Sequence, residues 1–347
     1  MQVRKEILIF SKYFGYSVGG AEKSILELLK QKENEGYKIN VLFVKNIKTF
    51  NAKNLKMELP KSWKIYEMEL KYEFFRFVYF NYFLNKSIIK KEILKFDPNK
   101  YILYSYGYFA PAAINAFKGE SVYLVRDEYG LGWNNNYYSG VKRILKEIYR
   151  IMEYPFYYKW KKDLYEAIKM SKLIANSKFI AKELKKISNK NIEIMYPYID
   201  ENKLINNWYK INKSNEKVKK GIVLIGDNIL KGSDIVKKIA KFLPQETFYI
   251  FDRKYVKPLQ KDNIVYMPWQ KNSIDVYKYA KLVLVPSRWY EAFGRVSKEC
   301  KVLDIPVIGS ARGGIVEILD ENELINDIEN INEWVKKIKE ALNEDNL

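Results

Sequence analysis

Histidine is missing altogether from this chain of 347 residues, and cysteine occurs once, as Cys300. Without an imidazole, the chain has no Ser-His-Asp or Cys-His catalytic arrangement, no histidine metal site and no imidazole proton shuttle. A lone cysteine excludes disulfide frameworks and thiolate zinc clusters and is typical of a reducing compartment. Any chemistry must therefore depend on carboxylates, lysine, arginine, hydroxyls, backbone amides or a bound cofactor.

Long hydrophobic runs are also lacking. The apolar run near the N-terminus covers only residues 7–10, which is too short for the apolar region of a signal peptide. The most aromatic stretch, residues 72–84, is interrupted by charged and polar side chains and is too short to cross a bilayer. We therefore expect a cytoplasmic protein, either free or peripheral on the inner face of the membrane.

Positive charge is abundant and unevenly distributed. The whole chain has 61 Lys and Arg against 42 Asp and Glu, a net charge of +19. Residues 1–200 hold 36 of the cations and 21 of the anions, a net charge of +15, whereas residues 201–347 hold 25 and 21, a net charge of +4. A positive field attracts the phosphates of nucleic acid, anionic lipid or a small nucleotide, but lysines are also common on ordinary solvated surfaces. Charge alone leaves these alternatives open.

Short apolar runs alternate with helix-length segments along the chain. The first fifty residues predict a strand at 6–10, a glycine loop, a helix from Ala21 and a strand at 39–44. A further helix is predicted at 232–242, and further strands at 101–104, 122–125, 173–175, 221–225, 248–251, 264–267, 281–285 and 305–308. Such alternation is typical of parallel sheets covered by helices.

A polar segment rich in Asn and Lys separates two sets of these elements. We place a linker at residues 201–217, between a first domain at 1–200 and a second at 218–347. The predicted fold class is α/β, with two doubly wound Rossmann-like domains that face each other across a cleft.

The segment from Val285 to Cys300 is the most informative for function. A predicted strand ends at Val285, and a helix is expected to begin near Gly294. Ligands of open α/β sheets bind at the carboxyl ends of strands, and the first amides of a helix attract anions. Glu291 precedes this helix and Glu299 lies within it, so the two carboxylates can contact different parts of one elongated ligand. The alternative is a solvated helix start with two surface glutamates.

This E-x7-E spacing resembles the signature of the retaining GT-B glycosyltransferases, in particular the large fourth family that uses nucleotide-diphosphate sugars. Further segments match this family in the expected order over about residues 5 to 318. They are Gly19-Gly20-Ala21-Glu22, Ala175-Asn176-Ser177-Lys178-Phe179, Tyr196-Pro197-Tyr198-Ile199-Asp200, Lys231-Gly232-Ser233-Asp234, Ile305-Pro306-Val307-Ile308 and Gly313-Gly314-Ile315-Val316-Glu317.

The resemblance implies a role for each matching residue. Glu299 would accept hydrogen bonds from the donor ribose, and Glu291 would contact the donor sugar as a catalytic residue. Lys231 would neutralise the departing diphosphate, which Gly20 would approach closely because it has no side chain. The donor-binding set is completed by Gly19, Arg288, Phe293, Gly294, Arg295 and Val296. No metal and no cofactor are expected, and the chain contains no D-x-D triplet of the kind that holds a metal in the other large transferase fold.

Two departures from the family pattern concern charged residues. Where many relatives carry a histidine in the first domain, this chain has Arg126, followed by Asp127. Arginine does not accept protons, so Arg126 would bind phosphate or a donor hydroxyl, unless it is a surface residue paired with Asp127 or Glu128. An arginine that many relatives place shortly before the Lys-Gly pair is also missing. We expect one of three other residues to replace it: Arg288, Arg295 or Arg253.

Two rival functions were compared with a glycosyltransferase. A nicotinamide enzyme is disfavoured because the glycine loop lacks G-x-G-x-x-G. A nucleic-acid-binding protein, or a glucosyltransferase that modifies DNA, is favoured by residues 141–172, where nine Lys and Arg alternate with aromatic residues. The same segment suits an anionic membrane surface or an ordinary helix pair.

We predict a metal-independent, retaining hexosyltransferase of polysaccharide biosynthesis that transfers sugar from a nucleotide-diphosphate sugar to a glycan or lipid-linked glycan. The second domain would bind the nucleotide sugar and the first the acceptor. An anionic membrane surface is a further expected partner, ahead of nucleic acid.

Overall fold

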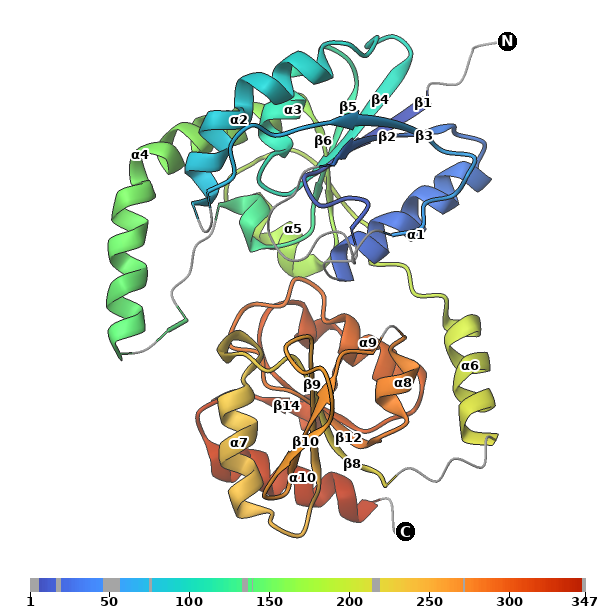
Figure 1. Cartoon of the computed structure of the whole chain (residues 1–347), viewed down its shortest axis with the longest axis vertical. Helices are drawn as coiled ribbons and strands as arrows, with labels where there is room; N and C mark the ends of the chain where they lie inside the picture. Colours follow the sequence, from blue (N-terminus) through green and yellow to red (C-terminus); the bar gives the residue numbers. More distant parts are fainter. Residues whose placement is uncertain are drawn as a thin grey trace. The chain divides into compact units, whose positions relative to one another are not determined.

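A computed structural model describes residues 6–16, 20–45, 57–74, 77–132, 137–138, 140–213, 219–270 and 272–344 (Figure 1). The chain divides into two compact units, unit 1 at Met1–Tyr198 and unit 2 at Ile199–Leu347. Each unit contains its own seven-stranded sheet, and we describe each by itself.

Unit 1 is built on a parallel sheet with the strand order β3-β2-β1-β4-β5-β6-β7. Its central strands are mostly apolar and almost wholly buried, as expected of strands covered on both faces. In the register, Ile9 lies opposite Val41 on one side and Tyr104 on the other. The strands are β1 (Glu6–Phe10), β2 (Ile39–Val44), β3 (Lys64–Met68), β4 (Tyr101–Tyr106), β5 (Ser121–Val125), β6 (Lys172–Ala175) and β7 (Ile192–Ile194).

The helices of unit 1 connect these strands. They are α1 (Gly20–Asn34), α2 (Val78–Ile93), α3 (Ala110–Ala116), α4 (Gly140–Met170) and α5 (Lys178–Lys185), with a short 3-10 helix η2 (Glu128–Leu131). Helices α2, α3 and α4 pack against one another. Helix α4 changes direction along its length (Figure 1) and contains Pro155, which has no backbone N–H and bends a helix from within.

Unit 2 contains a second sheet with the order β10-β11-β9-β8-β12-β13-β14. All of its neighbouring strands are parallel except β10, which pairs with β11 in the antiparallel sense at the edge. The elements are α6 (Glu201–Lys213), β8 (Gly221–Ile225), η3 (Ile229–Lys231), α7 (Ser233–Phe242), β9 (Phe248–Asp252), β10 (Leu259–Lys261), β11 (Ile264–Pro268), α8 (Ile274–Tyr277), β12 (Ala280–Val285), α9 (Arg295–Val302), β13 (Val307–Ser310), η4 (Gly313–Glu317), η5 (Glu321–Glu323), β14 (Leu324–Ile325) and α10 (Ile331–Glu344).

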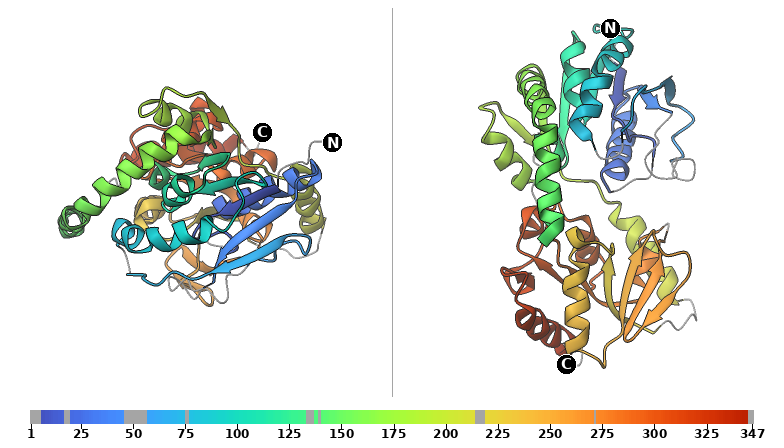
Figure 2. Two further views of the ribbon diagram at one scale, coloured as in Figure 1. Left: turned by 90° about the horizontal axis from the view of Figure 1, so that it is seen from above. Right: turned by 60° about the vertical axis from the view of Figure 1, so that its left-hand side comes forward.

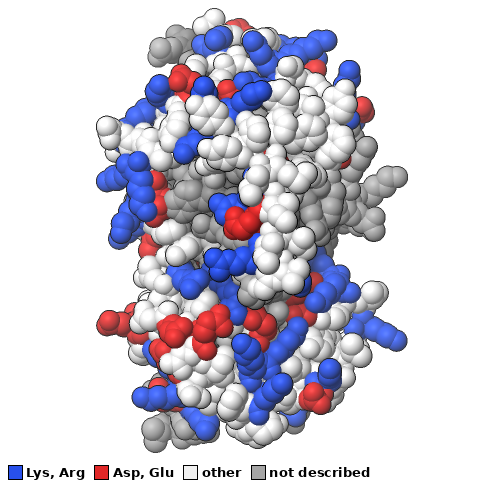
Figure 3. Space-filling model, turned by 90° about the vertical axis from the view of Figure 1, so that its left-hand side faces the viewer, with Lys and Arg blue, Asp and Glu red and all other residues white. Residues whose placement is uncertain are grey.

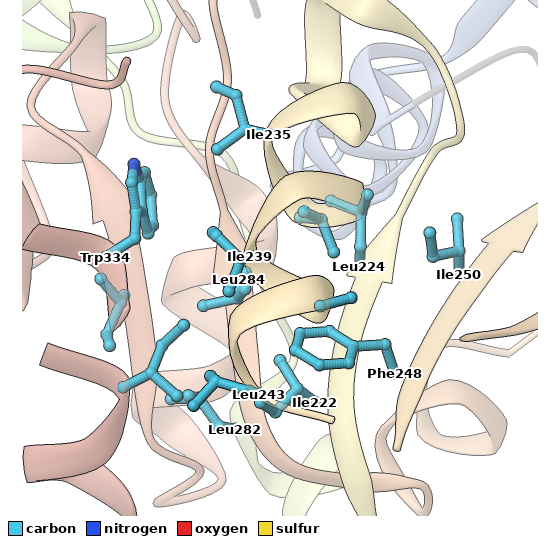
Figure 4. Close-up of a cluster of buried hydrophobic side chains, with 14 of the residues drawn as sticks. Ile222, Leu224, Ile235, Ile239, Leu243, Phe248, Ile250, Leu282, Leu284 and Trp334 are labelled. Atoms are coloured by element: carbon cyan, nitrogen blue, oxygen red, sulfur yellow. The ribbon is translucent and has the colours of Figure 1, made fainter. Parts of the chain in front are cut away.

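Apolar side chains cover both faces of this second sheet. On one face, α7 and α10 contribute Ile235, Ile239 and Trp334 to a buried cluster with strand residues such as Leu224 and Phe248 (Figure 4). The indole nitrogen of Trp334 donates a hydrogen bond of 3.1 Å to the backbone oxygen of Ile328, so its one polar group is satisfied. Fully burying one such apolar side chain contributes about 1.5–3 kcal/mol, which makes the sheet a rigid support for the loops at its edge.

Helix α6 occupies thirteen residues of the range in which the sequence predicts a linker. Its apolar residues Leu204, Ile205, Trp208 and Ile211 pack against the core on the opposite face of the second sheet. They recur at helical spacing, but many Asn and Lys residues between them conceal the pattern in the sequence. Residues 214–217 of the predicted linker lie outside the described residues.

The prediction of two doubly wound α/β units is confirmed, and the views in Figure 2 show both sheets with their flanking helices. Among the described residues, no helix is both long enough and apolar enough to cross a membrane. Within the same residues, no group of three or more Cys, Asp or Glu is arranged as a metal site.

Candidate active site

The strand order of unit 2 reverses between β8 and β12, and the residues predicted to be functional follow these two strands. From β8 the chain proceeds to β9 on one side, whereas from β12 it proceeds to β13 on the other. Loops that leave neighbouring strands in opposite directions open a crevice at the carboxyl edge of a sheet, where α/β proteins bind ligands. The two loops here cover residues 226–232 and 286–294.

Lys231 and Glu291 meet across these loops. The Lys231 Nζ lies 2.5 Å from the Glu291 Oε1, and the hydroxyl of Ser287 donates a hydrogen bond of 2.8 Å to the same oxygen. Burial opposes ionisation of Glu291, but the Lys231 ammonium outweighs burial, so the pKa of Glu291 lies below its usual value. About a third of the Lys231 side chain remains exposed. Glu291 is therefore ionised at neutral pH, and its lysine partner is accessible to a ligand.

Two glycines allow the loops to pack this closely. Gly232 has a φ of +72°, and a Cβ at this position would lie 2.0 Å from the backbone oxygen of Pro286. Gly313 has a φ of +63°, and its Cβ would lie 2.2 Å from the backbone oxygen of Glu291. The amide of Gly314 donates a hydrogen bond of 2.6 Å to that oxygen. The Lys-Gly and Gly-Gly motifs thus position Lys231 and Glu291 through backbone contacts.

Helix α9 starts directly after the Glu291 loop. Gly294 precedes it with a φ of +96°, a conformation that favours glycine. The first turn of any α-helix has amides without intrahelical partners and a positive dipole end, which suits an anion. Phe293 is 8% exposed, and Val296 packs on the core below the helix. These two residues therefore support the turn, which lies next to Glu291 in the chain.

Glu299 is buried within α9 and both of its oxygens have partners. Its Oε2 accepts a hydrogen bond of 2.8 Å from the hydroxyl of Tyr277, and its Oε1 one of 2.7 Å from the Nε of Arg295. Burial first, and then the neighbouring Glu299 charge, raises the pKa of Tyr277, which therefore stays protonated and donates. Each carboxylate oxygen can accept a second hydrogen bond, so Glu299 retains capacity for ligand hydroxyls.

The cations proposed to replace the missing arginine lie in different surroundings. Arg288 is nearly buried and forms two ion pairs of 2.6 Å, with Asp234 and Glu329. Arg295 contacts Glu299, and its Nη1 is buried without a hydrogen-bond partner among the described residues. The guanidinium of Arg253 lies 5.0 Å from the centre of the Trp269 ring.

Asp227 stands in the segment where the family arginine is missing. Its carboxylate is almost fully buried and contacts Lys237 at 2.6 Å and Lys254 at 2.7 Å, and the hydroxyl of Tyr255 also donates to it. Burial opposes its ionisation, but these partners outweigh burial and hold the pKa of Asp227 well below its usual range. An anion that is already paired with two lysines gives this position a structural role in bracing the β8 edge.

The residues predicted in unit 1 lie at the carboxyl edge of the first sheet. Arg126 follows β5 and is buried; its Nη2 donates to the hydroxyl of Ser24 in α1, near Gly20 at the start of that helix. Asp127 accepts a hydrogen bond of 2.8 Å from the amide of Gly130 and so supports η2. Burial of Arg126 at 6% exposure argues against the alternative of a surface arginine. Gly19 lies outside the described residues.

Comparison with protein families gives a match in the second half of the chain. Residues 179–347 match the family described as Glycosyl transferases group 1, and this range contains Lys231, Glu291 and Glu299. Residues 179–347 therefore contain the domain that defines this family. The prediction of a glycosyltransferase is thereby confirmed. Among curated proteins, the transferase is 26% identical over 211 residues to an uncharacterised 41.2 kDa protein in the cps region of Klebsiella pneumoniae. That match covers 52% of this chain and 57% of the relative, so the chain spans little more than half of the relative's length.

Solved structures resemble the transferase along almost its whole length. HepE of Anabaena in complex with UDP-glucose is 14% identical, with a TM-score of 0.66 over 99% of this chain and 91% of that one. WaaG, a glycosyltransferase involved in lipopolysaccharide biosynthesis, is 15% identical, with a TM-score of 0.62 over 97% and 90%. At these identities the likeness is one of fold, and it agrees with the predicted GT-B class.

Sequence reasoning missed several residues around the transferase site. The Trp289 ring centre lies 5.3 Å from the Lys231 Nζ, a cation–π contact, and Tyr277 reaches Glu299 from another helix. Trp289 stands two residues before Glu291, so its neighbourhood was a signal that could have been used. Tyr277 is 22 residues from its partner, and no sequence motif joins the two.

Proposed function

We propose that the chain is a retaining hexosyltransferase that moves a sugar from a nucleotide-diphosphate sugar to a glycan or lipid-linked glycan in polysaccharide biosynthesis. The observation that carries this proposal is the Lys231–Glu291 pair, 2.5 Å apart at the strand-order reversal of unit 2. A cation and a carboxylate held side by side at this edge suit a donor whose diphosphate and sugar adjoin.

Lys231 supplies positive charge to the leaving diphosphate. Its ammonium has three N–H donors, of which Glu291 engages one, so two remain for phosphate oxygens. The first amides of α9 add further positive potential next to Glu291. As the bond between the anomeric carbon and the phosphate oxygen breaks, charge grows on the diphosphate, and preorganised donors of this kind lower the barrier. The proposed reaction therefore needs no metal.

Glu291 and Glu299 would hold the two ends of the donor. Glu291 accepts hydrogen bonds from the sugar hydroxyls, while Glu299 accepts them from the ribose. Tyr277 and Arg295 fix the Glu299 carboxylate at 2.8 and 2.7 Å, so its orientation is set before the donor binds. Two fixed carboxylates on one loop-helix segment favour an elongated ligand.

The acceptor would bind to unit 1 at the inner face of the membrane, with Arg126 and Asp127 at the acceptor side. The net charge of +15 in residues 1–200 supports an anionic surface as partner. The similarity to WaaG, which is involved in lipopolysaccharide biosynthesis, and to a protein of a cps region supports a glycan acceptor.

A thermal-shift screen of nucleoside diphosphates and their sugars tests the proposal. UDP-glucose comes first, because a structural relative was solved with it. We expect one base to raise the unfolding midpoint, and the diphosphate to raise it more than the nucleoside alone. Lys231→Ala should abolish the difference between diphosphate and nucleoside, whereas Lys238→Ala, an exposed residue of α7, should keep it. No stabilisation by any of these ligands would contradict the proposal.

A further inference from the structure

The first part of helix α4 has a different environment from the rest of the helix. Beyond Pro155, α4 packs into unit 1 through buried residues such as Trp160 and Leu164. Residues 140–152, which we call the α4 arm, extend beyond the sheet of unit 1 (Figures 1 and 2). No residue of the arm belongs to the buried core. The arm is therefore a helical segment held mainly at one end.

One stripe of the α4 arm is apolar and exposed. Its members recur three or four residues apart, which places them on a single side of a helix with 3.6 residues per turn. Their exposed fractions run from 50% for Ile148 to 73% for Ile151. The stripe consists of Val141, Ile144, Leu145, Ile148, Ile151 and Met152. Six adjoining apolar side chains with this exposure form an extended patch, which is rare on a protein surface without a partner.

The opposite side of the α4 arm is cationic. Four cations stand against a single acid, Glu147, which gives the arm a net charge of +3. With 100° of rotation per residue, the mean direction of these four cations about the helix axis is about half a turn from that of the apolar stripe. They are Lys142, Arg143, Lys146 and Arg150. A short helix with an apolar stripe and a Lys- and Arg-rich polar face is the type that lies in the plane of a membrane surface.

Helix α2 fixes the orientation of the α4 arm. At the end of the arm, the buried Glu153 accepts hydrogen bonds of 2.8 and 3.2 Å from the amides of Tyr79 and Phe80, in the first turn of α2. One turn earlier, the ring of Tyr149 lies 5.0 Å from that of Phe77. These contacts lie on the side of the arm away from the apolar stripe. Because these contacts hold the other side of the arm against α2, the apolar stripe faces away from α2.

Exposed aromatic residues of α2 and the preceding segment lie next to α4 just beyond the arm. Phe74 and Phe83 are 49% and 43% exposed, and Phe156 of α4 lies 5.5 Å from Phe83, measured between ring centres. The Nζ of Lys159 lies 4.6 Å from the Phe83 ring. Figure 3 faces this side of the molecule, where white, uncharged side chains alternate with Lys and Arg.

We propose that the α4 arm, together with Phe74 and Phe83, is a docking surface for an anionic membrane, into which the apolar stripe inserts in the plane of the headgroups. Nucleic acid would require the cations on the outward face, whereas apolar residues occupy that face. A second copy of this chain has the same positive charge and is repelled, whereas an anionic lipid surface attracts it. The inference deepens the proposed function by naming a surface through which a lipid-linked acceptor is approached.

Co-sedimentation of the full chain with vesicles tests the apolar stripe. We expect binding to phosphatidylcholine vesicles that contain phosphatidylglycerol. Ile144→Gln/Ile151→Gln should weaken this binding by about tenfold or more, because two apolar side chains lose their burial in lipid. The matched control Ile65→Gln/Leu94→Gln changes two exposed apolar residues elsewhere in unit 1 and should leave binding unchanged. Equal loss in both variants, or no vesicle binding by the unaltered chain, would overturn the proposal.

The charged face is tested in the same assay. Lys142→Glu/Arg143→Glu should remove most of the preference for anionic over neutral vesicles, and high salt should do the same. The control Lys90→Glu/Lys91→Glu makes the same charge change on exposed residues of α2 and should keep the preference.

Two other occupants of the surface give different results. Light scattering that shows a dimer disrupted by Ile144→Gln/Ile151→Gln, without vesicle binding, would assign the surface to a second copy. Binding of duplex DNA without vesicle binding would assign it to nucleic acid, and both results contradict the proposal. The thermal shift with the donor depends on unit 2 and should persist in every arm variant. Its loss in the unaltered chain would refute the proposed function and leave vesicle binding as a separate result.

Discussion

Units 1 and 2 each contain a seven-stranded, doubly wound sheet, but their functional residues are held in different ways. In unit 2, Lys231 contacts Glu291, and Glu299 accepts a hydrogen bond from Tyr277 of a neighbouring helix. Gly232 and Gly313 allow the loops that carry Lys231 and Glu291 to pack closely. In unit 1, the distinctive features are a positive charge and an exposed apolar helix. The family match begins at residue 179 and thus covers all of unit 2.

This difference reflects the tasks that we assign to the two units. A small charged donor requires particular side chains at fixed spacing, because each must reach a defined atom. A membrane surface requires only an apolar stripe and cations on the opposite side, which many sequences provide. The functional residues of unit 2 can therefore be predicted from sequence motifs. The docking surface of unit 1 can be identified only when the exposure of its side chains is known.

The largest effect should follow from removing the cation of unit 2. We predict that Lys231→Ala lowers kcat by about 10²–10³, the loss typical of one donor that stabilises transition-state charge. The fold should survive, with a modest fall in the unfolding midpoint, because the largely buried Glu291 loses its cationic partner. Steady-state kinetics with Lys238→Ala as a control would measure this, and turnover like that of the unaltered enzyme would remove Lys231 from the mechanism.

Two glycines with positive φ, one in each unit, allow the packing of the backbone to be compared between the units. In unit 2, Gly232→Ala places a Cβ 2.0 Å from the Pro286 oxygen, whereas in unit 1 the Cβ of Gly140→Ala has nothing within 4 Å. Both changes incur the left-handed strain of about 1–2 kcal/mol, so the excess loss in Gly232→Ala reports the clash. We expect Gly232→Ala to lower the unfolding midpoint clearly further, as measured by circular dichroism. Equal midpoints would mean that the loops relax without cost.

Two buried glutamates should respond to pH in opposite directions. Burial raises the pKa of Glu153 in unit 1 above its ordinary value of 4.5, so the folded state binds its proton first and gains stability as pH falls through that pKa. The pKa of Glu291 in unit 2 is lowered, so its contribution is complete above 4.5 and is lost as pH falls through the folded-state pKa.

We therefore compare unfolding free energies of Glu153→Gln and Glu291→Gln with the unaltered chain between neutral and acidic pH. As pH falls, the unaltered chain should gain stability relative to Glu153→Gln and lose it relative to Glu291→Gln. Changes of the same sign for both variants would contradict the assigned surroundings.

The smallest effect is expected from removing metal. Because Lys231 and the first amides of α9 supply the positive charge at the diphosphate, we predict the same kcat within about twofold with and without EDTA. A large loss that Mg²⁺ or Mn²⁺ restores would show that the proposed mechanism is incomplete.

Much of the fold could be predicted from the sequence. The strands Glu6–Phe10, Ile39–Val44 and Gly221–Ile225 match the expected ranges because they are apolar runs bounded by polar residues. Strands β3 and β10 were not predicted: β3 is mostly exposed or half-buried and β10 is exposed throughout, so neither has an apolar pattern. Helix α6 was hidden by its many Asn and Lys residues.

The candidate active site could be predicted only in part from the sequence. Lys231, Glu291 and Glu299 could be selected because their motifs have fixed spacing, but their roles stay predictions. The ion pairs of Arg288 and the lysine partners of Asp227 depend on residues 10 to 54 positions away, which only the folded chain brings together. The exposed stripe of α4 was invisible for a similar reason, because the sequence does not state which face of a helix is covered.

The most direct test of the central claim, that Lys231 and Glu299 bind opposite ends of one nucleotide, is calorimetric titration with a nucleoside and its diphosphate. We use the base that gives the largest thermal shift. Lys231→Ala should reduce affinity for the diphosphate to that for the nucleoside, whereas Glu299→Gln should weaken binding of both ligands to a similar degree. Equal affinity of the unaltered chain for nucleoside and diphosphate, or an unchanged diphosphate affinity in Lys231→Ala, would contradict the claim.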